Sequence, residues 1–172
     1  MTRRHLNLGV IQRILGLLLM LFSVTMLVPA AVSLLYADGQ VALFVDAFLI
    51  LMAAGLLAWL PTRRQRGDLR LRDGFLVVVL FWSVIGLAGA VPFFLADDPR
   101  MTVTEAVFES VSGFTTTGAT VLVGLDDLPP SILYYRQQIQ WLGGIGIVVL
   151  AVALLPLLGI GGMQLLKAET PG

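Results

Sequence analysis

Residues 115–120 of this chain read Thr-Thr-Thr-Gly-Ala-Thr and lie between two long apolar segments. They offer consecutive carbonyl oxygens beside small side chains, and glycine permits backbone conformations that other residues resist. Non-helical backbone at membrane depth is tolerated only where it is buried in protein or lines a water-filled cavity. A cation satisfies such carbonyls when they replace its hydration shell. The segment therefore predicts an ion-selectivity filter, whose chemistry is coordination and not covalent catalysis.

A short helix is expected immediately before this filter. Thr102 and Glu105 have the spacing of a capping box, in which each side chain bonds a backbone N–H of the other residue. Gly113 is expected to end the helix as a residue that tolerates positive φ. A helix over 102–112 is about 16 Å long, roughly half the hydrocarbon thickness, so it enters the membrane without crossing it. The negative dipole end of this re-entrant pore helix favours a cation at the filter.

Glu109 lies within the predicted pore helix, close to the filter. A carboxylate buried there needs partners. We therefore expect Glu109 to bond the backbone of the filter or of the pore helix, and not the ion itself. Together with Thr115 and Thr120, which border the filter, it is interpreted as filter support.

The composition indicates that most of the chain is surrounded by lipid. Hydrophobic residues make up 58% and charged residues 13%, whereas a soluble domain has about a quarter charged residues. Uncharged stretches over 14–37, 74–96 and 137–166 each reach the roughly 20 residues that a spanning helix needs. A fourth stretch, 41–60, contains one charged residue, Asp46. The sequence thus predicts an all-α membrane protein with four transmembrane helices, the re-entrant pore helix and the filter loop.

Several function classes lack the residues they require. The chain has no cysteine and a single histidine, His5. Disulfides, thiolate nucleophiles and zinc sites are therefore not expected. An intramembrane enzyme is disfavoured because no serine or acid has a histidine or lysine partner at membrane depth. We expect neither enzymatic activity, nor a cofactor, nor binding to nucleic acid.

The arginines predict the orientation of the chain in a plasma membrane. With a cytoplasmic amino terminus, four crossings place all of the eleven basic residues except Arg100 and Arg136 on the cytoplasmic side. The predicted layout has a cytoplasmic amino terminus (1–13), a transmembrane hairpin (14–60) that turns around Asp38 and Gly39, a basic cytoplasmic loop (61–74), a pore module (75–166) and a cytoplasmic tail (167–172). The pore module contains an outer helix (75–96), the pore helix (102–112), the filter (115–120) and an inner helix (132–158).

Two further features concern helix packing. Pro29 is expected to kink the first helix, with a neighbouring helix covering the carbonyl that it frees. Gly143, Gly144 and Gly146 reduce the bulk of the inner helix where it passes behind the filter. Close packing is favoured for them, and a gating hinge remains the alternative. Arg136 is expected to pair with an acid on the outer side or to extend toward the interface.

Two segments together resemble a known family. They are Phe-Glu-Ser-Val-Ser-Gly-Phe-Thr-Thr-Thr-Gly-Ala-Thr at 108–120 and Gln-Trp-Leu-Gly-Gly-Ile-Gly-Ile at 140–147. They resemble the first pore repeat of the Trk/Ktr/HKT potassium-uptake family, most closely its bacterial TrkH-like branch. The resemblance implies that K⁺ is the transported ion. It also implies that the carbonyls coordinating it belong to Thr116, Thr117, Gly118 and Ala119.

Family members carry four such repeats in one polypeptide, and this chain has one. We favour an amino-terminal portion of a longer transporter, comprising the leading hairpin and the first repeat, over a small subunit that assembles from identical copies. The resemblance further implies a bacterial inner-membrane location and a cytoplasmic nucleotide-binding regulatory subunit. The alternative function is that of a noncatalytic membrane scaffold or assembly subunit without conduction of its own, whose threonine-rich loop merely packs.

Overall fold

The computed structural model describes residues 7–65 and 71–157, and within these ranges the chain is helical with no β-strand. The all-α prediction is confirmed. Single turns of 3-10 helix lie at Leu60–Thr62 and Leu125–Asp127. The α-helices are α1 (Leu8–Val24), α2 (Leu27–Tyr36), α3 (Val41–Trp59), α4 (Leu71–Ala88), α5 (Ala90–Leu95), α6 (Val103–Phe114) and α7 (Pro130–Leu157).

Helical segments long and apolar enough to cross a membrane coincide with the first three predicted spans. They are Leu8–Tyr36, Val41–Thr62 and Asp73–Leu95, with 29, 22 and 23 residues. The fourth predicted span overlaps α7, whose 28 residues extend about 42 Å. The part of that span after Leu157 lies outside the described residues, as do the predicted tail and part of the basic loop.

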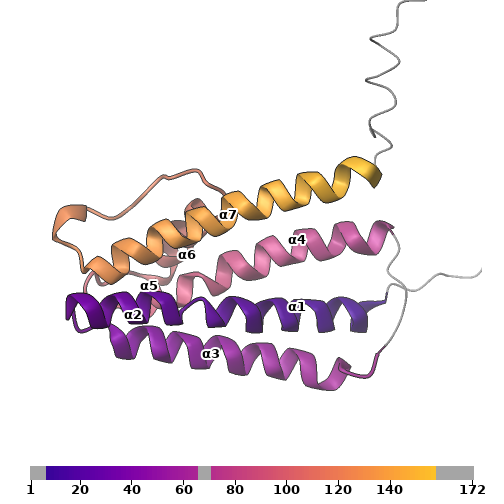
Figure 1. The fold of residues 1–172 in the computed structure, drawn as a ribbon, viewed down its shortest axis with the longest axis horizontal. Helices are drawn as coiled ribbons and strands as arrows, with labels where there is room; N and C mark the ends of the chain where they lie inside the picture. Colours follow the sequence, from indigo (N-terminus) through magenta and orange to yellow (C-terminus); the bar gives the residue numbers. More distant parts are fainter. Residues whose placement is uncertain (1–6, 66–70, 158–172) are drawn as a thin grey trace, which may run out of the picture.

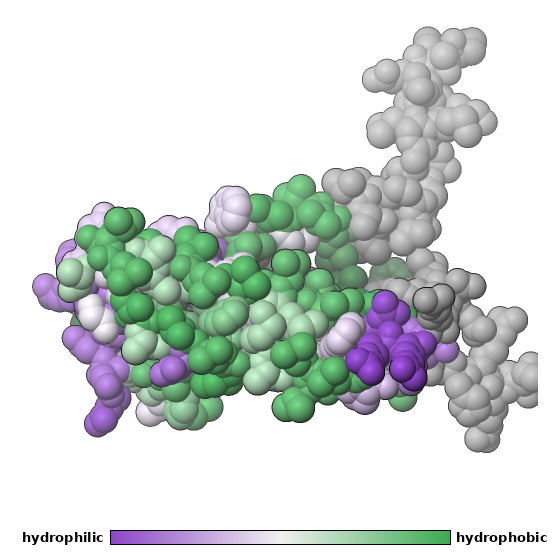
Figure 2. Space-filling model, turned by 60° about the horizontal axis from the view of Figure 1, so that its bottom comes forward, coloured by the Kyte–Doolittle hydropathy of each residue, from purple (hydrophilic) through white to green (hydrophobic). Residues whose placement is uncertain are grey.

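The long helices run side by side. Figure 1 shows α1 between α3 and α4, with α7 passing over the bundle next to α6, and α2 continuing α1. The loop between α6 and α7 carries the predicted filter. On the face drawn in Figure 2, apolar residues cover most of the length and hydrophilic residues gather toward the ends. That distribution fits a protein that exposes its middle to hydrocarbon.

The first helix is interrupted where Pro29 requires it. Thr25 and Met26 form a turn between α1 and α2. Because proline has no N–H, the carbonyl four residues earlier, that of Thr25, loses its helical donor. Gln138 of α7 replaces it, since its Nε2 donates to the Thr25 carbonyl oxygen at 3.0 Å. The helix is thus interrupted near Pro29, and a neighbouring helix covers the freed carbonyl as expected.

The predicted outer helix (75–96) is also divided, which the sequence reading did not anticipate. Gly89 separates α4 from α5, three residues before Pro92. The hydroxyl of Tyr135 in α7 donates to the Gly89 carbonyl oxygen at 2.8 Å, and the hydroxyl of Ser110 in α6 donates to that of Gly86 at 2.7 Å. Side chains of the pore module therefore hold the backbone at this break.

Buried aromatic rings connect the hairpin to the pore module. Tyr135 of α7 is fully buried, and its ring centroid lies 5.7 Å from that of Phe44 in α3 and 5.1 Å from that of Phe93 in α5. Nearer the filter, Phe22 of α1 meets Phe114 at the end of α6 edge to face, at 5.5 Å. The two parts thus share one core.

Candidate functional site

The pore helix begins as predicted. Thr102 precedes the first residue of α6, and its Oγ1 accepts the Glu105 N–H at 3.3 Å. In return, Glu105 Oε2 accepts the Thr102 N–H at 2.8 Å, so the capping box is complete. The helix has 12 residues and is about 18 Å long. Two orphan backbone donors are thereby satisfied, and α6 starts at a fixed place.

The predicted end of the pore helix is wrong by two residues. The helix continues through Gly113 to Phe114, and Gly113 is not among the glycines with positive φ. A Cβ on Gly113 would lie 2.5 Å from Ile139 Cδ1 of α7. This glycine therefore allows α6 and α7 to approach closely, and it does not terminate the helix.

The filter segment is a turn followed by irregular backbone, which agrees with the predicted non-helical conformation. Thr116 and Gly118 have positive φ, 57° and 74°. The N–H groups of Thr117 and Gly118 both donate to the Ser112 carbonyl oxygen, at 3.0 and 3.4 Å, and the Thr116 N–H donates to that of Gly113 at 2.9 Å. These bonds satisfy carbonyls that the end of a helix leaves without donors, and they fold the segment back on α6.

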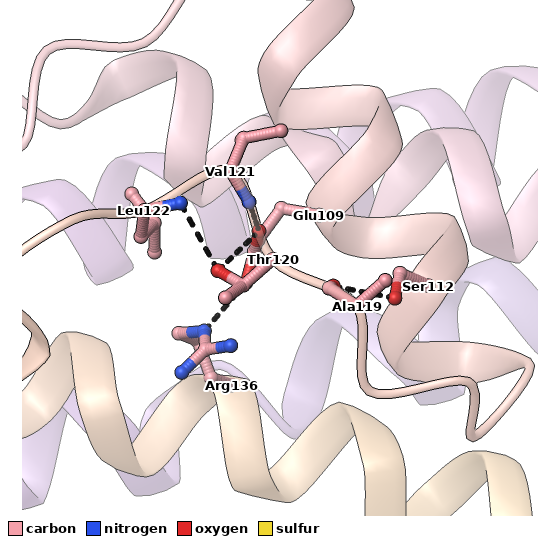
Figure 3. Close-up of polar contacts among 7 residues, drawn as sticks. All are labelled: Glu109, Ser112, Ala119, Thr120, Val121, Leu122 and Arg136. Carbon is pink, nitrogen blue, oxygen red and sulfur yellow. Dashed lines mark hydrogen bonds and ion pairs between the residues drawn. The ribbon is translucent and has the colours of Figure 1, made fainter.

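The carbonyl groups of this segment have different surroundings. Among the described residues, nothing donates a hydrogen bond to the carbonyl oxygens of Thr116, Thr117 and Gly118, and all three residues are exposed. The Ala119 carbonyl oxygen differs, because it accepts the Ser112 hydroxyl at 2.6 Å (Figure 3). Three oxygens are therefore available to an ion, while a fourth is shared with α6.

Glu109 anchors the end of the filter, as expected. Both of its carboxylate oxygens lie 3.0 Å from the Thr120 hydroxyl, and its Oε2 accepts the Val121 N–H at 3.2 Å (Figure 3). Thr120 Oγ1 in turn accepts the Leu122 N–H at 3.0 Å. The carboxylate is nearly completely buried, at 3% exposed. It therefore acts on the backbone that leaves the filter.

Arg136 pairs with this same carboxylate. Its Nε lies 2.6 Å from Glu109 Oε1, and Arg136 is 6% exposed. The expected pairing with an acid is therefore observed, and the partner is Glu109 of the pore helix because α7 packs directly against α6. A buried ion pair is tolerable when further hydrogen bonds satisfy it, and Thr120 and Val121 provide them. Figure 3 shows the arginine from α7 and the filter meeting at the carboxylate.

The glycines of the inner helix have unequal surroundings. A Cβ on Gly143 would lie 2.0 Å from the Phe114 carbonyl oxygen, so α7 crosses the end of α6 in direct backbone contact. A Cβ on Gly146 would lie 3.3 Å from Trp82. One on Gly144 would meet nothing closer than 3.9 Å, at Thr116 Cγ2. Close packing therefore explains Gly143 and accounts in part for Gly146, and Gly144 has room.

Sequence reasoning missed three residues that shape the site. Ser112 holds the Ala119 carbonyl, Gln138 covers the helix break at Thr25, and Asp38 bonds the start of α7. Gln138 carried a usable signal, because it is one of three glutamines, at 137, 138 and 140, near the start of an otherwise apolar span, and polar groups there need partners. Ser112 and Asp38 carried no such signal, because their neighbouring residues predict only a helix end and a turn, respectively.

Comparison with known proteins points to one family. The sequence model of the TrkH family, described as a cation transport protein, matches residues 40–172. The Trk system potassium uptake protein TrkH of Vibrio parahaemolyticus is 62% identical over 162 residues, which are 94% of this chain and 33% of that relative. The protein of the same name from Escherichia coli K12 is 57% identical over 162 residues, 94% of this chain and 34% of the relative. The chain spans about a third of the length of these curated relatives.

A solved structure agrees with the sequence comparison. The crystal structure of the potassium transporter TrkH from Vibrio parahaemolyticus superimposes with a TM-score of 0.85 at 60% sequence identity. The match covers 91% of this chain and 34% of that one. The helical hairpin and the helix–loop–helix module are therefore a known membrane arrangement, and the chain belongs to the TrkH family of cation transport proteins.

Proposed function

We propose that this chain takes part in potassium uptake across a membrane by supplying one of four filter repeats. The carbonyl oxygens of Thr116, Thr117 and Gly118 coordinate K⁺, and the Ala119 oxygen contributes its remaining lone pair. One observation carries this proposal: the N–H groups of residues 115–118 bond to α6, while residues 116–118 are exposed and their carbonyl oxygens accept nothing within the described residues. Backbone in that state at membrane depth needs a cation or water.

Partners follow from the geometry of coordination. One segment provides about a quarter of the oxygens around an ion, so a lone copy cannot replace its hydration shell. The remaining repeats come from a longer polypeptide of the relatives' length or from identical copies of this chain. Other components of a Trk system, including a cytoplasmic nucleotide-binding regulatory subunit, belong to the same proposal. Membrane lipid surrounds the exposed apolar faces.

The remaining residues have supporting roles in this proposal. Glu109 and Thr120 hold the outgoing end of the filter, and Thr115 holds its beginning, since the Thr115 and Thr117 hydroxyls lie 2.8 Å apart. Gly143 and Gly146 let the inner helix pass close behind, and movement at Gly144 would serve gating. The distribution of basic residues supports a cytoplasmic amino terminus, and the proposed location is a bacterial inner membrane.

Replacing Gly118 with serine tests the proposal. A Cβ there meets nothing within 4 Å, so Gly118→Ser introduces no clash and acts through the positive φ of 74°. In cells lacking other potassium uptake and expressing the complete transporter, we expect the K⁺/Na⁺ uptake ratio to fall about tenfold, equivalent to ~1.4 kcal/mol.

Gly124→Ser is the matched control. Gly124 has a φ of 67°, and a Cβ there would meet nothing closer than 3.5 Å, at Asp127 Oδ2, but it lies beyond the filter at the start of the 3-10 turn Leu125–Asp127. It carries the same backbone penalty without touching the filter, so the uptake ratio should stay unchanged. An equal ratio in both variants and in the unmodified transporter would contradict potassium coordination here and favour the scaffold alternative.

A further inference from the structure

The amino end of α7 has no capping side chain of its own. Pro129 stands at the cap position, where serine, threonine, aspartate or asparagine would accept a first-turn N–H. The cap comes instead from the hairpin, because Asp38 Oδ2 accepts the Ser131 N–H at 2.9 Å across 93 residues of sequence. A carboxylate is favoured at this positive end of a helix.

The other oxygen of the same carboxylate holds the hairpin turn. Asp38 Oδ1 accepts the Ser33 hydroxyl and also the Gln40 N–H, the latter at 3.2 Å. Asp38 therefore joins the end of α2, the start of α3 and the start of α7 at one point. Loss of either oxygen breaks one side of this connection.

A second polar contact lies two turns along α7. Gln138 is 8% exposed, and it donates to the Thr25 carbonyl at the break between α1 and α2. Ser131 and Gln138 are seven residues apart and share one face of the helix. Tyr135 lies between them on that face and packs on Phe44 of the hairpin. Two hydrogen bonds and one aromatic ring thus fix this face against α1–α3.

A neighbouring face of α7 carries the contacts that shape the filter. Arg136 bonds Glu109, Ile139 lies where a Cβ on Gly113 would be, and Gly143 crosses the end of α6. One rigid helix therefore contacts the hairpin on one side and the filter support on the other. Any rotation or shift of α7 that follows loss of the hairpin contacts moves the Glu109–Arg136 pair as well.

We propose that the α1–α3 hairpin positions the filter, and that Asp38 and Gln138 are positioning residues for ion selectivity. This inference rests on the proposed function, because it assumes that the filter selects an ion. Functional constellations must be held to within about 0.5 Å, and the apolar contacts of the hairpin resist sliding and rotation less specifically than hydrogen bonds do. The hairpin thus contributes to selectivity without touching the ion.

Two variants with matched controls test the inference in the complete transporter. Gln138→Leu removes the bond to Thr25 at nearly constant volume, and Gln137→Leu makes the same change at the adjacent exposed position, where the structure gives no hydrogen bond. Asp38→Ala removes both sides of the hairpin connection. Its control is Asp46→Ala, an exposed aspartate of α3 for which the described residues provide no hydrogen bond or ion pair.

We expect the K⁺/Na⁺ uptake ratio, measured per amount of folded transporter in the membrane, to fall about threefold to tenfold in Gln138→Leu and Asp38→Ala. Asp38→Asn keeps one acceptor oxygen, so its effect should be intermediate. If Asp38→Ala does not fold, the uptake ratios of Gln138→Leu and Asp38→Asn still test whether the hairpin affects selectivity. Folded variants with an unchanged ratio would overturn the inference, even if total uptake fell. They would show that the hairpin stabilises the fold without affecting selectivity.

Gly118→Ser separates this inference from the proposed function. If Gly118→Ser changes the ratio and the hairpin variants do not, only the role of the hairpin is wrong. If Gly118→Ser also leaves the ratio unchanged, the proposed function fails and the inference fails with it.

Discussion

The leading hairpin and the pore module are both made of apolar helices, yet different contacts hold them together. Within the hairpin, α1 and α3 meet at Gly16 and Gly55, where a Cβ on either would lie 2.9 Å from the carbonyl oxygen of the other. Within the pore module, α6, α7 and the filter meet at the buried Glu109–Arg136 pair, with Thr120 beside it. Small residues form the contact within the hairpin, whereas charged and hydroxyl groups form the contact within the pore module.

The difference follows from what each region must hold. Helices satisfy their own backbone groups, so close packing is sufficient to join them in lipid. The filter does not satisfy its own backbone, and it therefore needs side-chain donors and acceptors from two helices. Packing changes between α1 and α3 should consequently alter stability alone, whereas changes at the contacts that hold the filter should alter ion handling as well.

The largest effect is expected for Glu109→Ala. It leaves the Arg136 guanidinium buried without its partner, which costs about 3–5 kcal/mol, and it releases Thr120 and Val121. Thermal unfolding in detergent should show a large loss of stability, and uptake should be nearly abolished. Glu105→Ala, on the exposed side of the same helix, removes only the capping box and should cost much less stability. Selective uptake retained by Glu109→Ala would show that the pair does not support the filter.

Gly143→Ala and Gly55→Ala sharpen the comparison between the two regions. In each, the added Cβ comes too close to another helix, at 2.0 Å from the Phe114 carbonyl oxygen and 2.9 Å from that of Gly16. Overpacking should cost both about 1–3 kcal/mol. Only Gly143→Ala should also change the K⁺/Na⁺ uptake ratio, since Phe114 directly precedes the filter. Gly74→Ala in α4, where a Cβ meets nothing within 4 Å, is the control.

A smaller effect is expected for Ser112→Ala. The change removes one hydrogen bond, to the Ala119 carbonyl, and should cost about 1 kcal/mol. The K⁺ concentration for half-maximal uptake should change because the fourth oxygen is no longer directed. Ser83→Ala removes a hydroxyl that bonds within its own helix, to Val79 at 2.9 Å, and should leave that concentration unaltered. Identical transport in both variants would argue that Ala119 does not contribute.

The smallest effect is a pH dependence of the contact between the two regions. Burial acts to raise the pKa of Asp38, but hydrogen bonds from Ser33, Ser131 and Gln40 outweigh it and hold the pKa below its usual range. A lowered folded pKa means that the stabilisation is complete above the ordinary aspartate pKa, about 4, and disappears as the pH falls through the folded value. The stability difference between the unmodified protein and Asp38→Asn should therefore shrink only below about pH 4. A difference that shrinks at neutral pH would contradict this assignment.

Local patterns in the sequence were sufficient for the features that depend on nearby residues. The capping box, the break near Pro29 and the non-helical backbone of 115–120 could be predicted because each depends on spacing or on the backbone of one residue. The conformation of the filter could not, since its positive φ values arise from bonds back to Ser112.

Features that depend on a distant partner were misread or missed. A glycine near a helix end indicates either a cap or a close approach, and only Ile139, on another helix, decides between them at Gly113. Arg136 finds its acid 27 residues earlier in the chain, and Asp38 finds Ser131 93 residues later. Tertiary packing determines these contacts, and the neighbouring sequence does not indicate them.

Thr116 adopts a left-handed backbone, at φ 57°, that a β-branched residue avoids when free. This conformation is imposed by the carbonyl oxygens of Gly113 and Ser112, which accept hydrogen bonds from the N–H groups of the turn. Grafting 115–120 alone into another channel would therefore transplant the right atoms without their conformation. A graft that keeps this conformation must be larger, and must include α6 and the first turns of α7.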